Sequence, residues 1–353
     1  MPSLQNVRRR IKSVKSIQQI TKAMDMVATS RMRHAKEAAI ANHPYAGKAQ
    51  EVFDSIAVQA EDMGHPLFED RGNDEGRTLL IVIAADKGLA GAYSSNVFKA
   101  AHAEIDEDKK SEGNIPEDLS TLKDLRRRPR HTNLKKVSRV MTATHRSNMM
   151  RSSSTYRSGV KTSKPTEEIV ELQDKGNVDV LTVGRKATDH FRHRNYNVVR
   201  YYNGISERPN YQHAQDIAKF AIEKFLSGDV NEVVLVYTRF ISAINCEPRV
   251  VDLLPFYAYD RDAESGVKSE YIYEPAAEEV LDEFLPQYLV AIIYEALLQS
   301  AASELSSRMN AMSNATDNAQ ELIKKLDLYY NKVRQAGITN EINEIVGGAN
   351  ALE

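Results

Sequence analysis

The sequence predicts an α/β protein in which a long antiparallel coiled coil of the N- and C-terminal helices joins a Rossmann-like globular base. At both ends of the chain, apolar residues recur at steps of three and four, which is the pattern of an amphipathic helix. The middle instead alternates short apolar runs with amphipathic segments, which is typical of a sheet layered with helices. We expect a coiled-coil shaft at residues 1–60 and 276–353, the base at 77–105 and 166–260, and an insertion at 106–165.

The composition excludes several classes of protein. The chain has 353 residues, of which 42% are hydrophobic, so it is able to bury a core. Its 47 Lys and Arg nearly balance 49 Asp and Glu, so no net charge draws the whole chain to nucleic acid. The single cysteine, Cys246, excludes an internal disulfide framework and any multi-cysteine metal site. No apolar run approaches the roughly 20 residues that a membrane-spanning helix needs.

Residues 3–60 predict one long helix with basic residues between its apolar positions. The expected apolar seam consists of Leu4, Val7, Ile11, Val14, Ile17, Ile20, Met24 and Val27. Pro44 lacks an amide hydrogen, so we expect a kink near His43. The run of about 40 residues before that kink would extend about 60 Å, which is longer than a compact domain requires.

The base is expected to contain five strands and three helices. The strands are predicted at residues 78–84, 178–183, 197–202, 232–240 and 249–254, and the helices at 94–105, 187–194 and 212–227. The last two strands are joined too closely for a crossover connection, so they should form an antiparallel edge of the sheet.

The insertion at residues 106–165 begins acidic, becomes strongly basic and has no apolar period. We therefore expect it to be poorly ordered and solvated. Binding to nucleic acid or to anionic lipid is the alternative that its charge leaves open. Its one aromatic residue, Tyr156, gives little support to base stacking.

Residues 275–346 predict a second long helix. Pro286 suits a first helical turn, so the helix should begin there, and Gly347 and Gly348 should end it. Its heptad seam is expected at Leu305, Met309, Met312, Thr316, Ala319, Ile323, Leu326, Tyr330 and Val333. An intramolecular antiparallel coiled coil would bury both seams in a rod. The alternatives are two helices lying flat on the sheet and a parallel coiled-coil dimer.

No pattern of catalytic residues is found. The loop 86–93 follows a strand and opens a helix, where backbone amides can hold phosphate. Its glycine spacing fits neither a Walker loop nor a dinucleotide fingerprint, which favours a tight turn. His190 and His193 lie among arginines that would repel a metal ion, so we expect them on a solvated helix face.

Several motifs resemble the gamma subunit of F-type ATP synthases, the central rotor shaft of that enzyme. They lie at residues 20–28, 84–96, 184–186, 237–243, 308–312, 314–318, 330–335 and 344–348. The resemblance covers about five-sixths of the chain, in order. The insertion at 106–165 departs from the family pattern, and Ala92 replaces a glycine that is usual in its turn.

The resemblance implies a non-catalytic subunit of a proton-translocating ATP synthase, which couples rotation of a c-ring to conformational cycling of the catalytic beta subunits. Its implied partners are the alpha and beta subunits as a hexamer, the epsilon subunit and the c-ring, with one copy per complex and no cofactor or metal. The start at Met1 without a presequence leads us to expect the cytoplasmic face of a bacterial inner membrane, peripherally bound. A static coiled-coil scaffold, a nucleic-acid- or lipid-binding protein acting through the basic insertion, and a nucleotide-binding enzyme remain as alternatives.

The resemblance also implies a set of rotor–stator coupling residues. They are Met24, Arg308, Arg334, Gln335, Thr339, Glu341 and Glu344. Met24 and Arg308 are expected to face each other near the lever of a beta subunit. Arg334 and Gln335 match positions that engage a beta-subunit loop, where an arginine fork can pair with carboxylates. The other three match positions implicated in coupling, although each could be an ordinary surface residue of a coiled coil.

Overall fold

The computed structural model describes residues 4–70, 76–112, 178–257 and 276–350. The chain divides into two units, one of residues 1–106 and 175–353 and the other of residues 107–174. Of the second unit only residues 107–112, the end of a helix, are described, so most of the predicted insertion lies outside the described residues. All the described strands and both terminal helices belong to the first unit.

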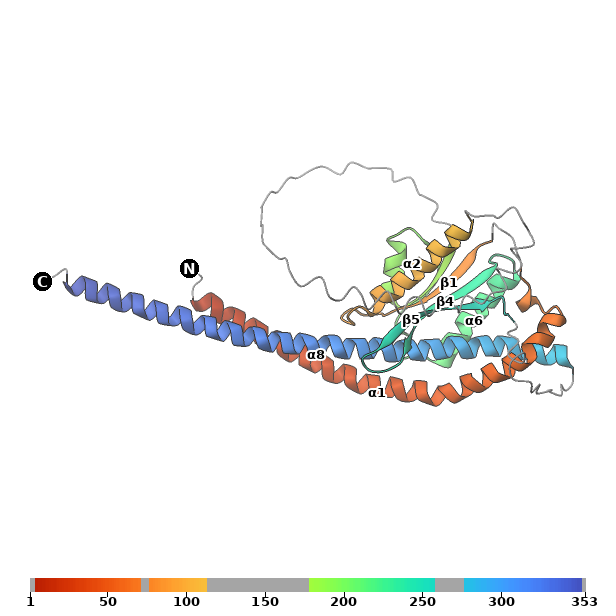
Figure 1. The fold of residues 1–353 in the computed structure, drawn as a ribbon, viewed down its shortest axis with the longest axis horizontal. Helices are drawn as coiled ribbons and strands as arrows, with labels where there is room; N and C mark the ends of the chain where they lie inside the picture. Colours follow the sequence, from red (N-terminus) through yellow and green to blue (C-terminus); the bar gives the residue numbers. More distant parts are fainter. Residues whose placement is uncertain (1–3, 71–75, 113–177, 258–275, 351–353) are drawn as a thin grey trace, which may run out of the picture. The chain divides into compact units, whose positions relative to one another are not determined.

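The predicted α/β fold with two long terminal helices is confirmed (Figure 1). The elements are α1 (Leu4–Asp62), η1 (Pro66–Phe68), β1 (Thr78–Ile83), α2 (Tyr93–Glu112), β2 (Val178–Val183), α5 (Arg185–Arg192), β3 (Asn197–Tyr202), α6 (Tyr211–Leu226), β4 (Glu232–Phe240), β5 (Cys246–Leu254) and α8 (Ala277–Asn350). Helix α2 continues past residue 105 into the acidic start of the insertion, and β5 begins earlier than residue 249 because it pairs with β4 down to their connecting turn. None of the described helices has an apolar stretch long enough to cross a bilayer.

The ends predicted for the second long helix are wrong. Helix α8 begins at Ala277, contains Pro286 in its interior and continues past Gly347 to Asn350. Proline removes one backbone hydrogen bond at a cost of about 3 kcal/mol. The buried side chains of Leu281, Leu285 and Leu289 on the same helix offset that cost. A glycine costs only about 1 kcal/mol within a helix, so a glycine pair alone does not end one.

The sheet has the order β3-β2-β1-β4-β5, with four parallel strands and an antiparallel β5 at one edge, as expected. Successive residues of β1 point to opposite faces. Leu79, Ile81 and Ile83 belong to a core shared with α1, α6 and α8, whereas Leu80 and Val82 belong to a core shared with α2 and α5. The two terminal helices therefore cover one face of the base.

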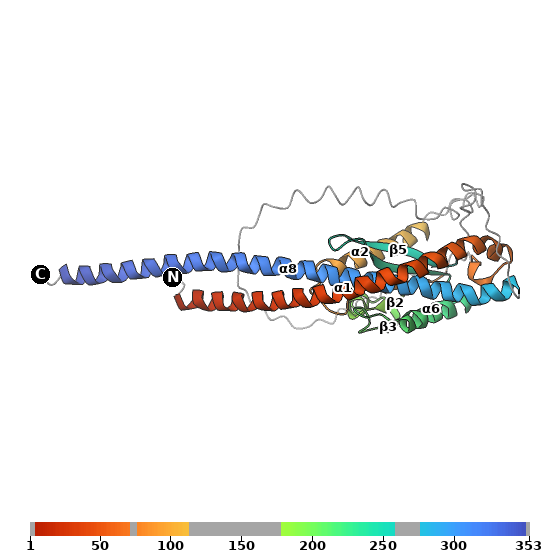
Figure 2. The same ribbon diagram turned by 90° about the horizontal axis from the view of Figure 1, so that it is seen from below.

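Helices α1 and α8 lie side by side and antiparallel in both views (Figures 1 and 2). Hydrogen bonds join Arg8 to Tyr330, Thr21 to Thr316, His43 to Glu295, and Gln50 to Tyr288, and the numbers of each pair sum to 337 or 338. This constant sum is the register of an antiparallel pair. The two helices pack flat on the sheet near residues 53–60 and 281–305, and they continue beyond it as a coiled coil. The rod and the flat arrangement are thus combined in one pair of helices.

Candidate coupling surface on the helical shaft

The seam predicted for α8 is confirmed. All nine of its positions, from Leu305 to Val333, are buried or half-buried. Beyond the base this seam is thin, because small or polar residues such as Thr316 and Ala319 fill part of it. Thr316 also donates a hydrogen bond of 2.8 Å to the Thr21 hydroxyl of α1.

The seam predicted for α1 is wrong after Val14. The buried and half-buried positions continue at Gln18, Thr21, Asp25 and Ala28, which keeps the alternating steps of three and four. The predicted positions follow Val14 with two steps of three, which rotates them onto the neighbouring face of the helix. Ile17, Ile20, Met24 and Val27 are consequently exposed, and we call this row the α1 stripe. The chain's own shaft does not cover it.

The C-terminal end of α8 extends beyond α1. Because α1 begins at Leu4, the register leaves α8 without a facing residue of α1 after about residue 334. The predicted coupling residues Arg334, Gln335, Thr339, Glu341 and Glu344 lie here and are all exposed. In the same stretch, Ile338, Ile342 and Ile345 expose large apolar side chains. We call residues 334–346 the α8 tip.

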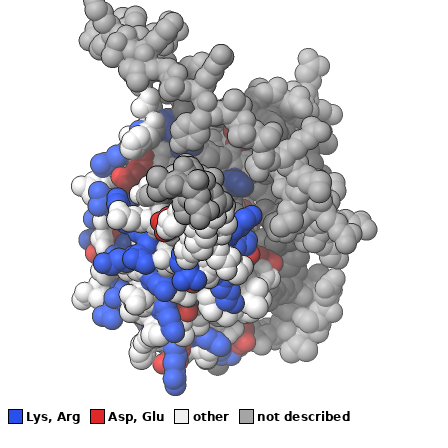
Figure 3. All heavy atoms as spheres, turned by 90° about the vertical axis from the view of Figure 1, so that its left-hand side faces the viewer, with Lys and Arg blue, Asp and Glu red and all other residues white. Residues whose placement is uncertain are grey.

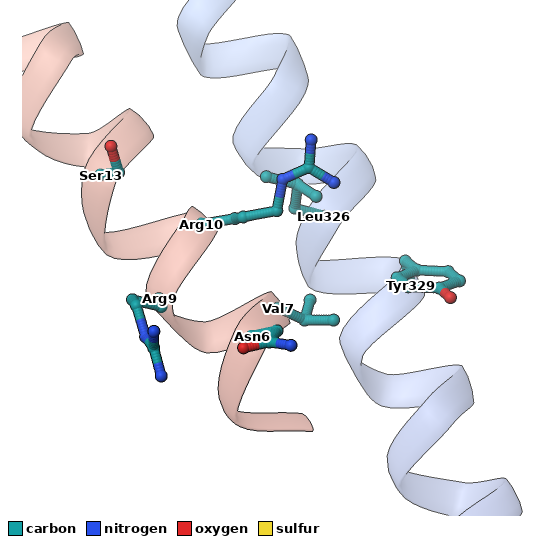
Figure 4. Close-up of a pocket in the computed structure, with 7 residues that line it drawn as sticks. All are labelled: Asn6, Val7, Arg9, Arg10, Ser13, Leu326 and Tyr329. Carbon is teal, nitrogen blue, oxygen red and sulfur yellow. The ribbon is translucent and has the colours of Figure 1, made fainter. Parts of the chain in front are cut away.

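The N-terminal part of α1 is positively charged. Residues 4–24 contain six Lys and Arg and no Asp or Glu. Figure 3, which views the molecule from the side of the α8 tip, shows Lys and Arg side chains spread over this face. A groove of about 640 Å³ lies between the two helices and is lined by Asn6, Val7, Arg9, Arg10, Ser13, Leu326 and Tyr329. Val7 and Arg10 reach toward α8, whereas Arg9 points away from it (Figure 4).

Arg308 does not lie on the exposed shaft. Its guanidinium contacts Glu207 Oε1 at 3.2 Å and Glu304 Oε1 at 2.5 Å, and the side chain is only 12% exposed. The register of the two helices puts Arg308 opposite about residue 30 and Met24 opposite about residue 314. The expectation that Met24 and Arg308 face each other is therefore wrong by more than one helical turn.

Glu207 is the centre of this charged group. Its Oε1 accepts hydrogen bonds from Lys87 and Arg308, each at 3.2 Å, and its Oε2 pairs with Arg31. Burial alone would raise the pKa of Glu207, but the hydrogen bond from Lys87 and the charges of Arg308, Lys87 and Arg31 outweigh it and hold the pKa below its ordinary value. Glu304 is more deeply buried, and burial raises its pKa although Arg308 opposes the shift.

Sequence reasoning missed Glu207 as a partner of Arg308, and it missed Lys87 and Arg31 as the other partners of Glu207. They lie on the loop after β3, on the loop after β1 and on α1, far from α8 in the chain. No local spacing brings such residues together. The one available signal was the presence of a charged residue in each of two loops that follow parallel strands, because those loops meet at one edge of a sheet.

The loop 86–93 joins the loops of the base to one another and lies against α8. The carboxylate of Asp86 accepts hydrogen bonds from the backbone amides of Arg185, Gly204 and Ser206, which joins the loops after β1, β2 and β3. Open parallel sheets bind ligands where the strand order reverses, here beside β1 and β4. At that place Gly91 lies against Ser307 and Ala311 of α8. Helix α8 of the shaft therefore lies where such sheets usually bind a ligand. This supports the interpretation of the loop 86–93 as a tight turn.

The β4–β5 hairpin holds α8 by polar contacts as well. The backbone amides of Thr238 and Phe240 donate to Ser300 and Gln299 of α8. In the turn, Ala243 O accepts from Ser306 and Asn310 of α8. Directional bonds thus join α8 to the last residues of β4 and to the turn that follows it.

His193 is exposed, as expected, but His190 is half-buried, which corrects the expectation for that position. Its ring stacks on Phe98 with a centroid distance of 3.9 Å, and its Nε2 lies 3.0 Å from His102 Nε2. Burial, the charge of Arg194 and His102 together lower the pKa of His190 to about 4. Within the described ranges, no three His, Cys, Asp or Glu side chains gather as they would around a metal ion.

Comparison with known proteins gives a consistent result. A family model described as ATP synthase matches residues 3–122 and 153–352. The ATP synthase gamma chain of Pelotomaculum thermopropionicum is 38% identical over the full length of both chains. Two structures of the Euglena gracilis mitochondrial ATP synthase share the fold. The rotor in rotational state 1 has 14% identity, a TM-score of 0.51, and coverage of 95% of this chain and 98% of that one. A chain of the assembly in rotational state 3 has 16% identity, a TM-score of 0.52, and coverage of 99% and 94%.

Proposed function

Because this chain belongs to the ATP synthase gamma-chain family, we propose that its shaft turns inside a ring of catalytic subunits and couples ion flow to ATP synthesis or hydrolysis. It is the non-catalytic central-stalk subunit of that enzyme. The observation that carries the coupling proposal is the pair of uncovered surfaces on the shaft, the α1 stripe and the α8 tip. Both expose apolar side chains that the rest of the described chain does not bury.

An exposed row of large apolar residues on a helix is typical of a surface that a partner covers. The α1 stripe lies on one side of the shaft, whereas the exposed Lys15 and Lys22 lie on the opposite side of α1. A surrounding subunit therefore meets an apolar face at one shaft angle and a basic face at another. Different contact energies at different angles are what is needed to favour different conformers of each catalytic subunit in turn.

The partners that we propose are the alpha and beta subunits around the shaft, and the epsilon subunit and c-ring at the base. One copy of this chain would serve each complex. We propose a peripheral position at the cytoplasmic face of a bacterial inner membrane. The exposed guanidinium of Arg334, together with the basic start of α1, suits partner segments rich in carboxylates, because Arg pairs with carboxylates bidentately.

The seven coupling residues divide into two kinds under this proposal. Met24 acts through the α1 stripe, and Arg334, Gln335, Thr339, Glu341 and Glu344 act through the α8 tip, all by direct contact with partner subunits. Arg308 acts differently, because its side chain is already bound within this chain. Its contribution is to hold the shaft in place.

Co-purification tests the proposed function directly. The tagged chain should be present as a single copy and should co-purify with alpha and beta subunits. The complex, placed in sealed vesicles, should pump protons when ATP is added. Light scattering that shows only homodimers without alpha or beta subunits would reject the rotor in favour of a static scaffold.

Met24→Lys tests the α1 stripe, with Met26→Lys as the matched control. Both methionines are exposed, at 41% and 60%, but two residues along a helix rotate Met26 to nearly the opposite side. Met24→Lys should lower the protons pumped per ATP hydrolysed while the complex still assembles, and Met26→Lys should lower it less. An equal effect of the two substitutions would contradict the proposal that the α1 stripe takes part in coupling.

A further inference from the structure

Charged side chains from four separate segments meet at the edge of the sheet where the shaft leaves the base. They are Arg31 of α1, Lys87 of the loop after β1, Glu207 of the loop after β3, and Glu304 and Arg308 of α8. Two of the segments belong to the base, and the other two are the helices of the shaft. The cluster lies just past Leu305, where the thick core between α8 and the sheet ends.

One carboxylate joins all of these segments. Glu207 accepts from Lys87 within the base, from Arg308 on one shaft helix and from Arg31 on the other. A carboxylate has acceptor sites enough for three such donors at once. Arg308 in turn is shared with Glu304, whose side chain is 1% exposed, so its position is fixed from two sides.

Directional bonds matter at this place for a mechanical reason. Apolar contact is non-directional, so the apolar core holds the shaft against the sheet without by itself specifying one rotational position. Charge-assisted hydrogen bonds have preferred lengths and angles and are about twice as strong as neutral ones. A base that turns must pass its torque to the shaft. The bonds of Glu207, together with those from Ser306 and Asn310 to Ala243 O, are the directional contacts nearest the thin coiled coil, so they bear that torque.

We propose that Glu207 is a positioning residue that locks the base to both shaft helices, so that rotation of the base passes to the shaft without slip. This inference rests on the proposed rotor function. It assigns a role in force transmission to a loop residue that does not touch the surface offered to partner subunits. Arg31, Lys87 and Arg308 are the three points that the lock holds.

The test uses the assembled complex in sealed vesicles. Glu207→Gln keeps the size of the side chain but removes its charge. Asp229→Asn is the matched control, because Asp229 pairs with Lys224 at 2.8 Å within the base and does not contact the shaft. ATP hydrolysis and proton pumping are measured together as the opposing proton gradient grows.

Glu207→Gln should retain ATP hydrolysis. The number of protons pumped per ATP hydrolysed should fall about twofold to thirtyfold, which is the range of effects that substitutions between two coupled sites produce. The loss should increase as the opposing gradient increases, because slip grows with load. Asp229→Asn should behave as wild type, and Glu207→Asp should restore part of the ratio. A substitution that only destabilised the base would lower hydrolysis and pumping together, with no dependence on load.

Two results would overturn the inference: a wild-type ratio for Glu207→Gln at the highest gradient, or an equal loss for Asp229→Asn. If Glu207→Gln fails to assemble, Arg31→Met removes the bond from Glu207 to one shaft helix at a side chain that is 42% exposed, and it must then show a load-dependent loss of the same kind. Failure of the proposed function is distinguishable, since the wild-type chain would then neither join alpha and beta subunits nor support pumping.

Discussion

The two halves of α8 differ although they belong to one continuous helix. The half from residue 277 to 305 has fully buried leucines on the sheet side, including Leu285, Leu289 and Leu297. The half from residue 306 to 346 has a narrow seam whose most buried members are Met312 and Ala319. The first half is packed firmly against the sheet, whereas the second half exposes most of its surface.

The polar residues of the two halves differ in the same sense. In the base-bound half, Ser300, Ser303 and Glu304 are buried and bonded to β4 or to Arg308. In the outer half, Ser306 and Asn310 still bond to Ala243 O of the base. Farther along the helix, the polar side chains of Asn314, Asp317 and Asn318 are exposed. The base-bound half is therefore attached firmly to the base, and the outer half makes few polar contacts within the chain. Substitutions in each half can test these two properties separately.

The largest effect on stability is expected in the base-bound half. Leu297→Ala should lower the free energy of unfolding by about 2–5 kcal/mol, because it leaves a cavity in a closed core. Leu326→Ala is the matched substitution in the outer half, where the side chain is only half-buried, and it should cost less. Urea unfolding of the full chain measures both. Equal losses would mean that the two halves do not differ in packing.

A smaller effect, with a pH signature, is expected at Asp86. Asp86→Asn should cost about 1.5–3 kcal/mol at neutral pH, because it removes a charged acceptor from three backbone amides. Burial opposes ionisation, but these bonds outweigh it and hold the pKa of Asp86 below its ordinary value of 3.8.

The sign of the pH dependence follows from that lowered pKa. The unfolded chain takes up the proton at a higher pH than the folded chain, so the stabilisation is complete above pH 3.8 and is lost as the pH falls through the folded pKa. The stability difference between wild type and Asp86→Asn should therefore shrink only below about pH 4. A difference that stays constant down to pH 2 would contradict the role given to this carboxylate.

Much of the fold was predictable from local patterns. The strands at 178–183, 197–202 and 232–240 were predicted with their observed bounds, since a short apolar run between turn residues is typical of a strand. The α8 seam was predicted because its steps alternate strictly. Pro286 was misread because a rule for helix starts ignores the packing of Leu281 and Leu289 on either side of it.

The candidate site was harder to predict, and α1 shows why. Ile17, Ile20, Met24 and Val27 are apolar but exposed, and a sequence does not distinguish an apolar residue facing its own chain from one facing a partner. Arg308 was expected to face Met24, and its partner Glu207 was missed because that residue is 101 positions away in the chain. Such long-range pairs become visible only when the topology is known.

In the outer half, one hydrogen bond across the seam gives a smaller effect. Thr316→Val removes the bond to Thr21 and keeps the shape of the side chain, so it should cost about 1 kcal/mol. Thr339→Val is the control, because the Thr339 hydroxyl donates only to Gln335 O of its own helix. In thermal unfolding, the melting temperature of Thr316→Val should be lower than that of the wild type, and the melting temperature of Thr339→Val should be close to it. A melting temperature for Thr316→Val that is not lower than that of Thr339→Val would show that the hydrogen bond across the seam at Thr316 does not stabilise the chain.

The smallest effect on the chain itself is expected at the α8 tip. Ile342 is 53% exposed and lies beyond the reach of α1, so Ile342→Ser should change the free energy of unfolding by less than about 0.5 kcal/mol. If partner subunits cover the tip, the same substitution should still weaken co-purification or lower ATP hydrolysis by the complex. Lys332→Ser, on an exposed position of the same helix just before the tip, controls for the loss of a long side chain. An unchanged complex with Ile342→Ser would mean that the outer half ends in a surface that no partner uses, since the chain's own stability gives that isoleucine no other reason to be apolar.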